Sequence, residues 1–315
     1  MKKSIILACC VLCVLSFGCA SKKQTPVKMD ATVTSNSYAA STQYIENGEY
    51  LKALDVLNQM PSDSRPEVYN SIGICYLNLG QPEMALQAFE KFTDLVPGAA
   101  AGFVNLGKSH FALEQYEKAE EAFQEAKALG AIAPAALGLA ACRLKTSEPE
   151  EALRFLLEAE KMTGVTSATR VNRAIAFFDM RLYSDALVYV EEELAVNSDS
   201  IDVLNLKGLI LYKQKQFDDA VKSYSMALAK SPRDGQIYLN RGVCYLAMQE
   251  FALAEDDFTR TVAYAPQLTQ VYLSRAEARY LLEDKVGACS DLAKACDFGF
   301  CERLELYQNK GYCDQ

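Results

Sequence analysis

Apolar and small residues recur along this chain with the spacing of paired amphipathic helices, most clearly from Gly235 to Leu268. Residues three and four apart share one face of a helix. The small and aromatic residues of this stretch form two such faces, one with Tyr238, Gly242 and Tyr245, the other with Phe251, Ala254, Phe258 and Val262. Pro266 would end the second helix, because proline lacks the backbone donor that a helix needs. The stretch therefore predicts two helices that pack against each other.

The same pattern returns about every 34 residues. The small residue of the second helix is found at Ala53, Ala85, Ala119, Ala152, Ala186, Ala220, Ala254 and Ala288, with gaps of 32, 34, 33, 34, 34, 34 and 34 residues. Its counterpart in the first helix is a glycine or alanine, at Gly73, Gly107, Ala140, Ala174, Gly208, Gly242 and Ala276. A period held over seven intervals predicts eight copies of one helix-turn-helix repeat.

This repeat resembles the tetratricopeptide repeat, a helix-turn-helix of about 34 residues. The resemblance covers about Thr34 to Phe300 and implies an all-α fold, a right-handed α-solenoid of about eight repeats. Beyond it, Glu302 to Asn309 is predicted to form a short amphipathic helix that caps the eighth repeat. The predicted organisation is a leader over 1–19, a flexible tether over 20–33, the solenoid over 34–300, and the cap and tail over 301–315.

The first 19 residues predict export and a lipid anchor. Two lysines precede an apolar run from Ile5 to Phe17, which is too short to span a bilayer as a helix and is typical of a cleaved signal. The run ends at Ser16-Phe17-Gly18-Cys19, which resembles a bacterial lipobox, although Ser16 stands where such motifs carry Leu. The resemblance implies that Cys19 receives the lipid. An ordinary signal peptide cut near Ala20 is the alternative.

The residues after Cys19 bear on where the protein is found. No Asp follows directly, which by resemblance to lipoprotein sorting implies the outer membrane of a Gram-negative-type envelope, with the protein facing the periplasm. The polar stretch over 20–33 has no helical apolar stripe and predicts a random-coil tether. Such a tether would hold the first repeat roughly 20–25 Å from the lipid.

Charge and motifs exclude several function classes. The net charge of -9 argues against nucleic acid and against flat adhesion to anionic lipid, since both depend on basic side chains. No HExxH, GxSxG, P-loop or GxGxxG motif occurs, so no catalytic site, metal or cofactor is predicted. The one histidine, His110, is expected to face the core and form a hydrogen bond. The acidic runs Glu191–Glu193 and Glu255–Asp257 are expected on solvated faces.

The cysteines fall into two groups. Cys75, Cys142 and Cys244 share one motif position and are predicted to be small buried apolar groups. The C-terminal four are predicted to form disulfides because an exported chain favours them, and their spacing lacks the CxxC of zinc sites, which remain the alternative. Across a hairpin of the last repeat helix and the cap helix, residues equally far from the turn face each other. This geometry predicts the pairs Cys296–Cys301 and Cys289–Cys313, whereas Cys289 and Cys296 would lie about 10 Å apart along one helix.

In tetratricopeptide repeats the first helices line the concave side, and fixed positions contact the ligand. The resemblance implies a partner-binding groove of Asn70, Ile74, Phe111, Val171, Ile175, Phe178, Asn205, Leu209, Tyr212, Leu239, Val243 and Tyr280. Lys108 falls on the same surface, which is mostly apolar and lacks the Lys/Asn/Arg set that clamps a peptide C-terminal carboxylate. The alternative is that these residues only pack neighbouring first helices together.

Two function classes follow. The first is a noncatalytic, membrane-anchored scaffold whose groove binds a protein or peptide partner in envelope, pilus or secretion assembly, as in the type IV pilus pilotins that it resembles. The alternative is a regulatory adaptor subunit of an envelope enzyme or secretion complex. Neither needs an enzyme activity, a cofactor, a nucleic acid or a small-molecule substrate.

Overall fold

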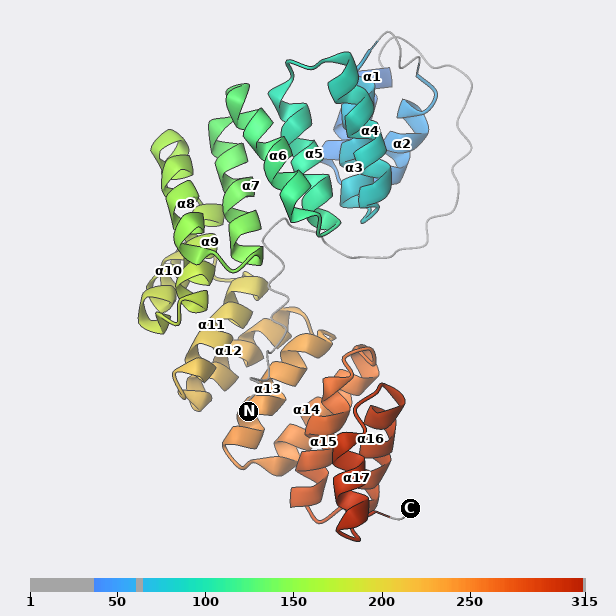
Figure 1. Ribbon diagram of the computed structural model, residues 1–315, viewed down its shortest axis with the longest axis vertical. Coiled ribbons are helices and arrows are strands. Elements are labelled where there is room, and N and C mark those ends of the chain that lie inside the picture. Colours follow the sequence, from blue (N-terminus) through green and yellow to red (C-terminus); the bar gives the residue numbers. More distant parts are fainter. Residues whose placement is uncertain (1–36, 61–64, 314–315) are drawn as a thin grey trace. The chain divides into compact units, whose positions relative to one another are not determined.

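The protein was analysed as a computed structural model, which describes residues 37–60 and 65–313 (Figure 1). Within these ranges the regular structure is entirely helical and contains no strand, so the predicted all-α fold is confirmed. The leader, the tether and Cys19 lie outside the described residues. Across the described ranges, no helix has both the length and the apolar character needed to cross a membrane.

The helices alternate between first and second members of a repeat, with one more helix at the end. The first helices are α1 (Ser37–Glu46), α3 (Glu67–Asn78), α5 (Ala100–Ala112), α7 (Ile132–Lys145), α9 (Ser167–Asp179), α11 (Ile201–Lys213), α13 (Gly235–Ala247) and α15 (Gln270–Leu281). The second helices are α2 (Tyr50–Leu57), α4 (Pro82–Leu95), α6 (Tyr116–Ala128), α8 (Pro149–Thr163), α10 (Tyr183–Val196), α12 (Phe217–Lys230), α14 (Phe251–Tyr264) and α16 (Lys285–Asp297). The last helix is α17 (Glu302–Asn309), at the place predicted for the cap.

The described chain divides into two compact parts, an N-terminal part that ends at Met180 and a C-terminal part that begins at Arg181. Within each part, every helix packs against the helix before it and the helix after it. First helices of neighbouring repeats also contact each other, as α3, α5 and α7 do. Figure 1 shows this side-by-side order within each part. It is the stacking of consecutive helix pairs that a repeat solenoid requires.

The core of each repeat depends on a close contact between the two helices. A Cβ atom added at Gly73 would lie 2.6 Å from the ring of Phe89, which is completely buried. The same contact is repeated at Gly107–Phe123, Gly208–Tyr224 and Gly242–Phe258. Because a methyl group so close to the ring would overlap it, only glycine fits opposite an aromatic side chain in this packing.

Repeats that carry alanine at the glycine position have a smaller side chain opposite it. The opposite residue follows sixteen positions later, and it is Leu156 for Ala140 and Leu292 for Ala276. All four of these residues are buried. Val190 likewise follows Ala174 by sixteen positions, and it stands where four other repeats carry an aromatic residue. A larger residue at the position on the first helix is therefore matched by a smaller side chain at the position on the second helix.

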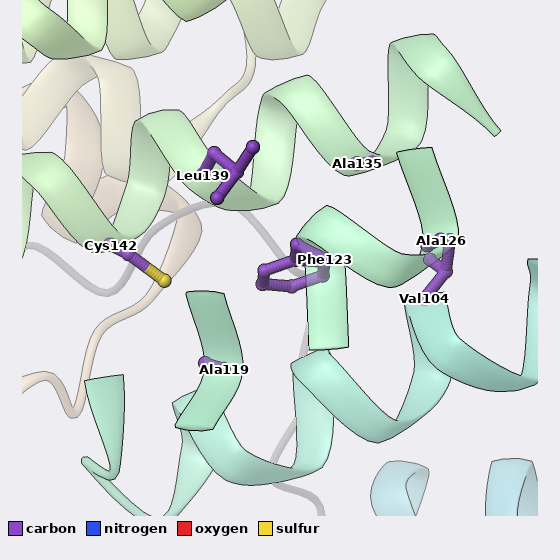
Figure 2. Close-up of a cluster of buried hydrophobic side chains, with 7 residues drawn as sticks. All are labelled: Val104, Ala119, Phe123, Ala126, Ala135, Leu139 and Cys142. Atoms are coloured by element: carbon purple, nitrogen blue, oxygen red, sulfur yellow. The ribbon is translucent and has the colours of Figure 1, made fainter. Parts of the chain in front are cut away.

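Figure 2 shows one of these cores, with Phe123 of α6 at its centre. Val104 of α5 and Leu139 and Cys142 of α7 belong to the same buried cluster. A Cβ atom at Gly138 of α7 would also meet the Phe123 ring. One aromatic side chain therefore packs its own repeat and joins that repeat to the next.

A residue in the left-handed region of backbone space follows each of the first helices given above and begins the turn. It is Gly48 and Gly80 in the first two repeats, and Glu114, Ser147, Arg181, Lys215, Gln249 and Glu283 in the later ones. At α5, the backbone N–H of Glu114 donates to Phe111 O at 3.0 Å and that of Gln115 donates to His110 O at 2.9 Å, which is the Schellman arrangement. This conformation costs non-glycine residues about 1–2 kcal/mol. The turn is therefore held by the packing of the helices that it joins.

Gly73→Ala is expected to lower the free energy of unfolding by about 1–3 kcal/mol, because the added methyl group overlaps the ring of Phe89. In a Phe89→Leu background the same change is expected to be neutral or stabilising, since helix propensity then favours alanine by about 1 kcal/mol. Denaturant unfolding of the four proteins measures the coupling between the two sites. An equal cost of Gly73→Ala in both backgrounds would contradict the volume relation.

Candidate partner-binding surface

The twelve predicted contact residues all lie on first helices, but they differ in burial. Val171, Ile175 and Leu209 are buried, at 5%, 6% and 4% exposure. The other nine are partly exposed. Leu239 and Val243 pack against a buried cluster that includes Phe258, and burial raises the pKa of the half-buried Tyr212. The surface therefore combines residues that join neighbouring helices with residues whose side chains still reach solvent.

Tyr280 has a different environment from the other predicted contact residues. Its ring lies 5.2 Å from that of Tyr307 and 5.5 Å from that of Tyr312, as measured between ring centroids. Tyr307 belongs to α17, and Tyr312 follows it. Leu304 and Tyr307 also pack against the buried cluster of Ala276 and Leu292. The cap therefore packs on Tyr280, a contact that the position of Tyr280 in the repeat did not reveal.

Two pairs of asparagines link neighbouring first helices. The side-chain amide of Asn105 donates to Asn70 Oδ1 at 2.9 Å, and that of Asn240 donates to Asn205 Oδ1 at 3.0 Å. The two members of each pair are 35 residues apart. These bonds fix the register between successive repeats, so the predicted contact residues Asn70 and Asn205 already have a structural role.

His110 is a core histidine, as predicted. It is 9% exposed, and its Nδ1 lies 2.8 Å from Gln115 Oε1. In the part of the chain that the structure describes, no group of three or more His, Cys, Asp or Glu side chains is placed to hold a metal ion. The hydrogen bond ties the end of α5 to the turn that follows it.

The expectation that both acidic runs lie on solvated faces is wrong for Asp257 and Glu193. Both residues are 1% exposed, whereas their neighbours Asp256 and Glu192 are exposed. Arg241 donates to both carboxylate oxygens of Asp257 at 2.8 Å, and this hydrogen bonding raises the pKa of Arg241. A buried carboxylate of this kind needs such a partner, because its desolvation is otherwise costly.

The ion pair of Arg241 belongs to a repeated network. Its remaining guanidinium nitrogen donates to Ser225 Oγ of the preceding repeat at 2.9 Å. One repeat later Arg275 donates to both oxygens of Asp291, at 2.9 and 2.7 Å, and to Thr259 Oγ1 at 3.3 Å. The spacing of sixteen residues between arginine and aspartate is the signal in the sequence that could have identified it. This network joins repeats six, seven and eight.

The cysteines occupy the predicted environments. Cys75, Cys142 and Cys244 are buried and outside any disulfide, and burial raises the pKa of Cys75 and of Cys244 to about 12. The thiols of Cys75 and Cys244 therefore remain protonated at neutral pH and are poor nucleophiles. The C-terminal cysteines form two disulfides, Cys289–Cys313 with a Cα–Cα distance of 5.6 Å and Cys296–Cys301 with one of 4.2 Å. They are the two predicted pairs, and they tie α16 to the cap.

Comparison with known proteins identifies the repeat. The tetratricopeptide repeat family model matches residues 71–136, 171–235 and 205–269, which together span more than half of the chain. Among curated proteins, the Hsp70-Hsp90 organizing protein of Triticum aestivum is 38% identical over 39 residues, which are 12% of this chain and 7% of that protein. The chain thus matches only a small segment of that relative.

Solved structures resemble this chain in fold. A tetratricopeptide repeat protein from Parabacteroides merdae matches with a TM-score of 0.57 and 17% identity over 76% of this chain and 95% of its own. Pseudomonas aeruginosa PilF matches with a TM-score of 0.57 and 20% identity, covering 70% and 99% of the two chains. The Cut9-Hcn1 hetero-tetramer of the APC/C gives a TM-score of 0.66 and 14% identity over 82% of this chain, which spans about half (52%) of that chain.

Loss of the long-range disulfide is expected to destabilise the last repeat. The 24-residue separation of Cys289 and Cys313 predicts a loss of about 3 kcal/mol for the double alanine variant in the chain-entropy model. Hydrogen exchange of α15 to α17 measures this loss. The matched Cys296→Ala, Cys301→Ala variant, which opens a loop of only five residues, is expected to lose less. Non-reducing peptide mapping tests the pairing itself, and four free C-terminal thiols would contradict it.

Proposed function

The chain belongs to the tetratricopeptide repeat family, and we propose that it is a noncatalytic scaffold that holds a protein or peptide partner on its first helices. Members of this family are generally scaffolds, and the fold is consistent with protein–protein interaction. The proposal concerns the partly exposed residues of each compact part separately. In the N-terminal part these include Phe111 and Phe178, and in the C-terminal part Tyr212, Leu239 and Val243.

One observation carries this proposal most directly. The first helices keep large apolar side chains partly exposed at equivalent positions of several repeats, as with Phe111 and Tyr212. Aromatic side chains that are rigid and partly exposed are typical anchors of binding interfaces, because they bury a large area at a low cost in side-chain entropy. Burial of such residues by a partner segment would use surface that the fold itself leaves open.

We also propose that the protein is lipid-anchored to the outer membrane and faces the periplasm. Support comes from the leader, from Gly18-Cys19 at its end, and from the polar stretch that follows. Pseudomonas aeruginosa PilF has a similar fold, and a role in pilus or secretion assembly is the form of scaffolding that we propose for this chain. The anchor would place the repeats near the membrane without any transmembrane helix.

Cys19→Ala is expected to release the protein from the membrane fraction, because the thiol that receives the lipid is lost. The variant should accumulate in a soluble or unprocessed form and should no longer incorporate a palmitate analogue during growth. Ala20→Ser, which keeps the thiol, serves as the control and should still be labelled. Unchanged labelling of Cys19→Ala would place the modification elsewhere.

Phe178→Ser with Tyr212→Ser is expected to abolish partner recovery from native envelopes by the full-length protein while the melting temperature stays within a few degrees. The reason is that both side chains are partly exposed on first helices. The matched control is Leu157→Ser with Met226→Ser, which removes two apolar side chains that are 48% and 54% exposed on second helices. If the first pair unfolds the array, these residues serve packing and the proposed surface is wrong.

A further inference from the structure

Basic side chains that are partly buried have a bonding partner almost everywhere in this protein. Ion pairs to carboxylates are formed by Lys52, Lys127, Lys207, Arg143, Arg173, Arg241, Arg275 and Arg279, and Arg170 also has a partner. Lys108 is the exception within residues 37–60 and 65–313. It is half-buried, and none of the described groups forms a hydrogen bond or an ion pair with it.

Lys108 lies on α5 at a position where most other repeats carry uncharged side chains. Its equivalents on the neighbouring first helices are Ile74 of α3 and Ala141 of α7. The other charged residue at this position is Glu277, which forms an ion pair with Arg303 of the cap at 3.1 Å. Of the two charged residues at this position, Glu277 has a counterion, whereas Lys108 has none among the described residues.

The surroundings of Lys108 are unfavourable for a free ammonium group. Burial is the cause that lowers its pKa, and no nearby carboxylate opposes the effect. Phe111 lies three residues later on the same helix face. Asn105, three residues earlier, bonds to Asn70 through its amide group, which leaves the amide N–H groups of Asn70 available as further donors. The first helices thus present hydrogen-bond donors at this point, inside a largely apolar surface.

A desolvated charge without a counterion reduces stability, and such residues persist where function needs them. Packing does not require Lys108, because isoleucine and alanine occupy the same place in adjacent repeats. A carboxylate brought by a bound segment would provide both the missing charge and a hydrogen-bond acceptor. The ammonium group of a lysine is a compact charge at the end of a flexible side chain. One such group can pair with a single carboxylate in the middle of a bound segment.

We propose that Lys108 is a specificity-determining contact, and that the segment held by α3, α5 and α7 is an apolar peptide with one internal Asp or Glu side chain that pairs with Lys108. This inference rests on the proposed function, since it requires the first helices to be the binding surface. It adds the chemical class of the ligand and names the residue that selects it. The carboxylate belongs to a side chain and not to the end of a chain.

The probe for this inference is a display library of random 16-residue peptides whose C-terminal ends are fused to the carrier, so that no free terminal carboxylate is offered. The full-length protein in detergent is expected to select apolar peptides with one acidic residue. An amidated synthetic copy of a selected peptide should bind at least tenfold more weakly to Lys108→Met. Replacing the acid of the peptide by its amide should cause the same loss, and the two changes together should cause no more.

Two further variants make the test specific. Lys108→Glu is expected to reject the acidic peptide and to bind its lysine-substituted copy, which restores the pair with reversed charges. Lys213→Met removes an exposed lysine from α11 and should leave the affinity unchanged. Lys108→Met should raise the melting temperature by about 2–4 °C, as expected when an uncompensated charge is removed, whereas a fall would assign Lys108 a structural role.

The possible failures are distinguishable. In one case, peptides bind and Phe111→Ser abolishes their binding, but the peptides show no preference for acidic residues or bind Lys108→Met equally well. The inference about Lys108 is then wrong, and the proposed function stands. If only peptides with a free terminal carboxylate bind in a companion synthetic set, the assignment to an internal side chain is overturned. If no selected peptide depends on Phe111, the proposed function fails in this part, and the inference fails with it.

Discussion

The close contact between a buried side chain on the second helix and a glycine or alanine on the first helix is the interaction on which the rest of this structure depends, and in four repeats that side chain is an aromatic ring against a glycine. It sets how closely the two helices approach, and it requires residues that lie only sixteen positions apart, as Gly73 and Phe89 do. Each repeat can therefore form its core from its own residues and those of its neighbours. Phe123, which also meets Gly138 of the next repeat, shows how the same contact extends along the chain.

Most of the fold was predictable from the sequence, because the information that specifies it is local and repeated. The alanines from Ala53 to Ala288 give the number of helix pairs directly. The disulfide pairs followed from the symmetry of a helical hairpin, with Cys296 and Cys301 beside the turn and the other two farther from it. Both arguments need only helix geometry and the order of residues along the chain.

The candidate surface was less predictable, because burial and ion pairing depend on neighbours from other helices. In the run Glu255–Asp257, Asp256 is exposed to solvent and Asp257 is buried. The only sign in the sequence that Asp257 is buried is Arg241, its ion-pair partner sixteen residues earlier. Tyr280 is predicted to line the groove, and the sequence did not reveal that the cap also packs on its ring. Likewise, Lys108 looks like any surface lysine until the partners of all other half-buried basic residues are known.

The bond between Cys289 and Cys313 also determines how the end of the chain responds to a pulling force. Tension applied beyond Cys313 passes through the disulfide to Cys289 in α16, so that α17 and the turn before it carry none of the load. The last repeat therefore cannot be peeled away helix by helix from its end. Under reducing conditions the same tension would instead reach α17 first.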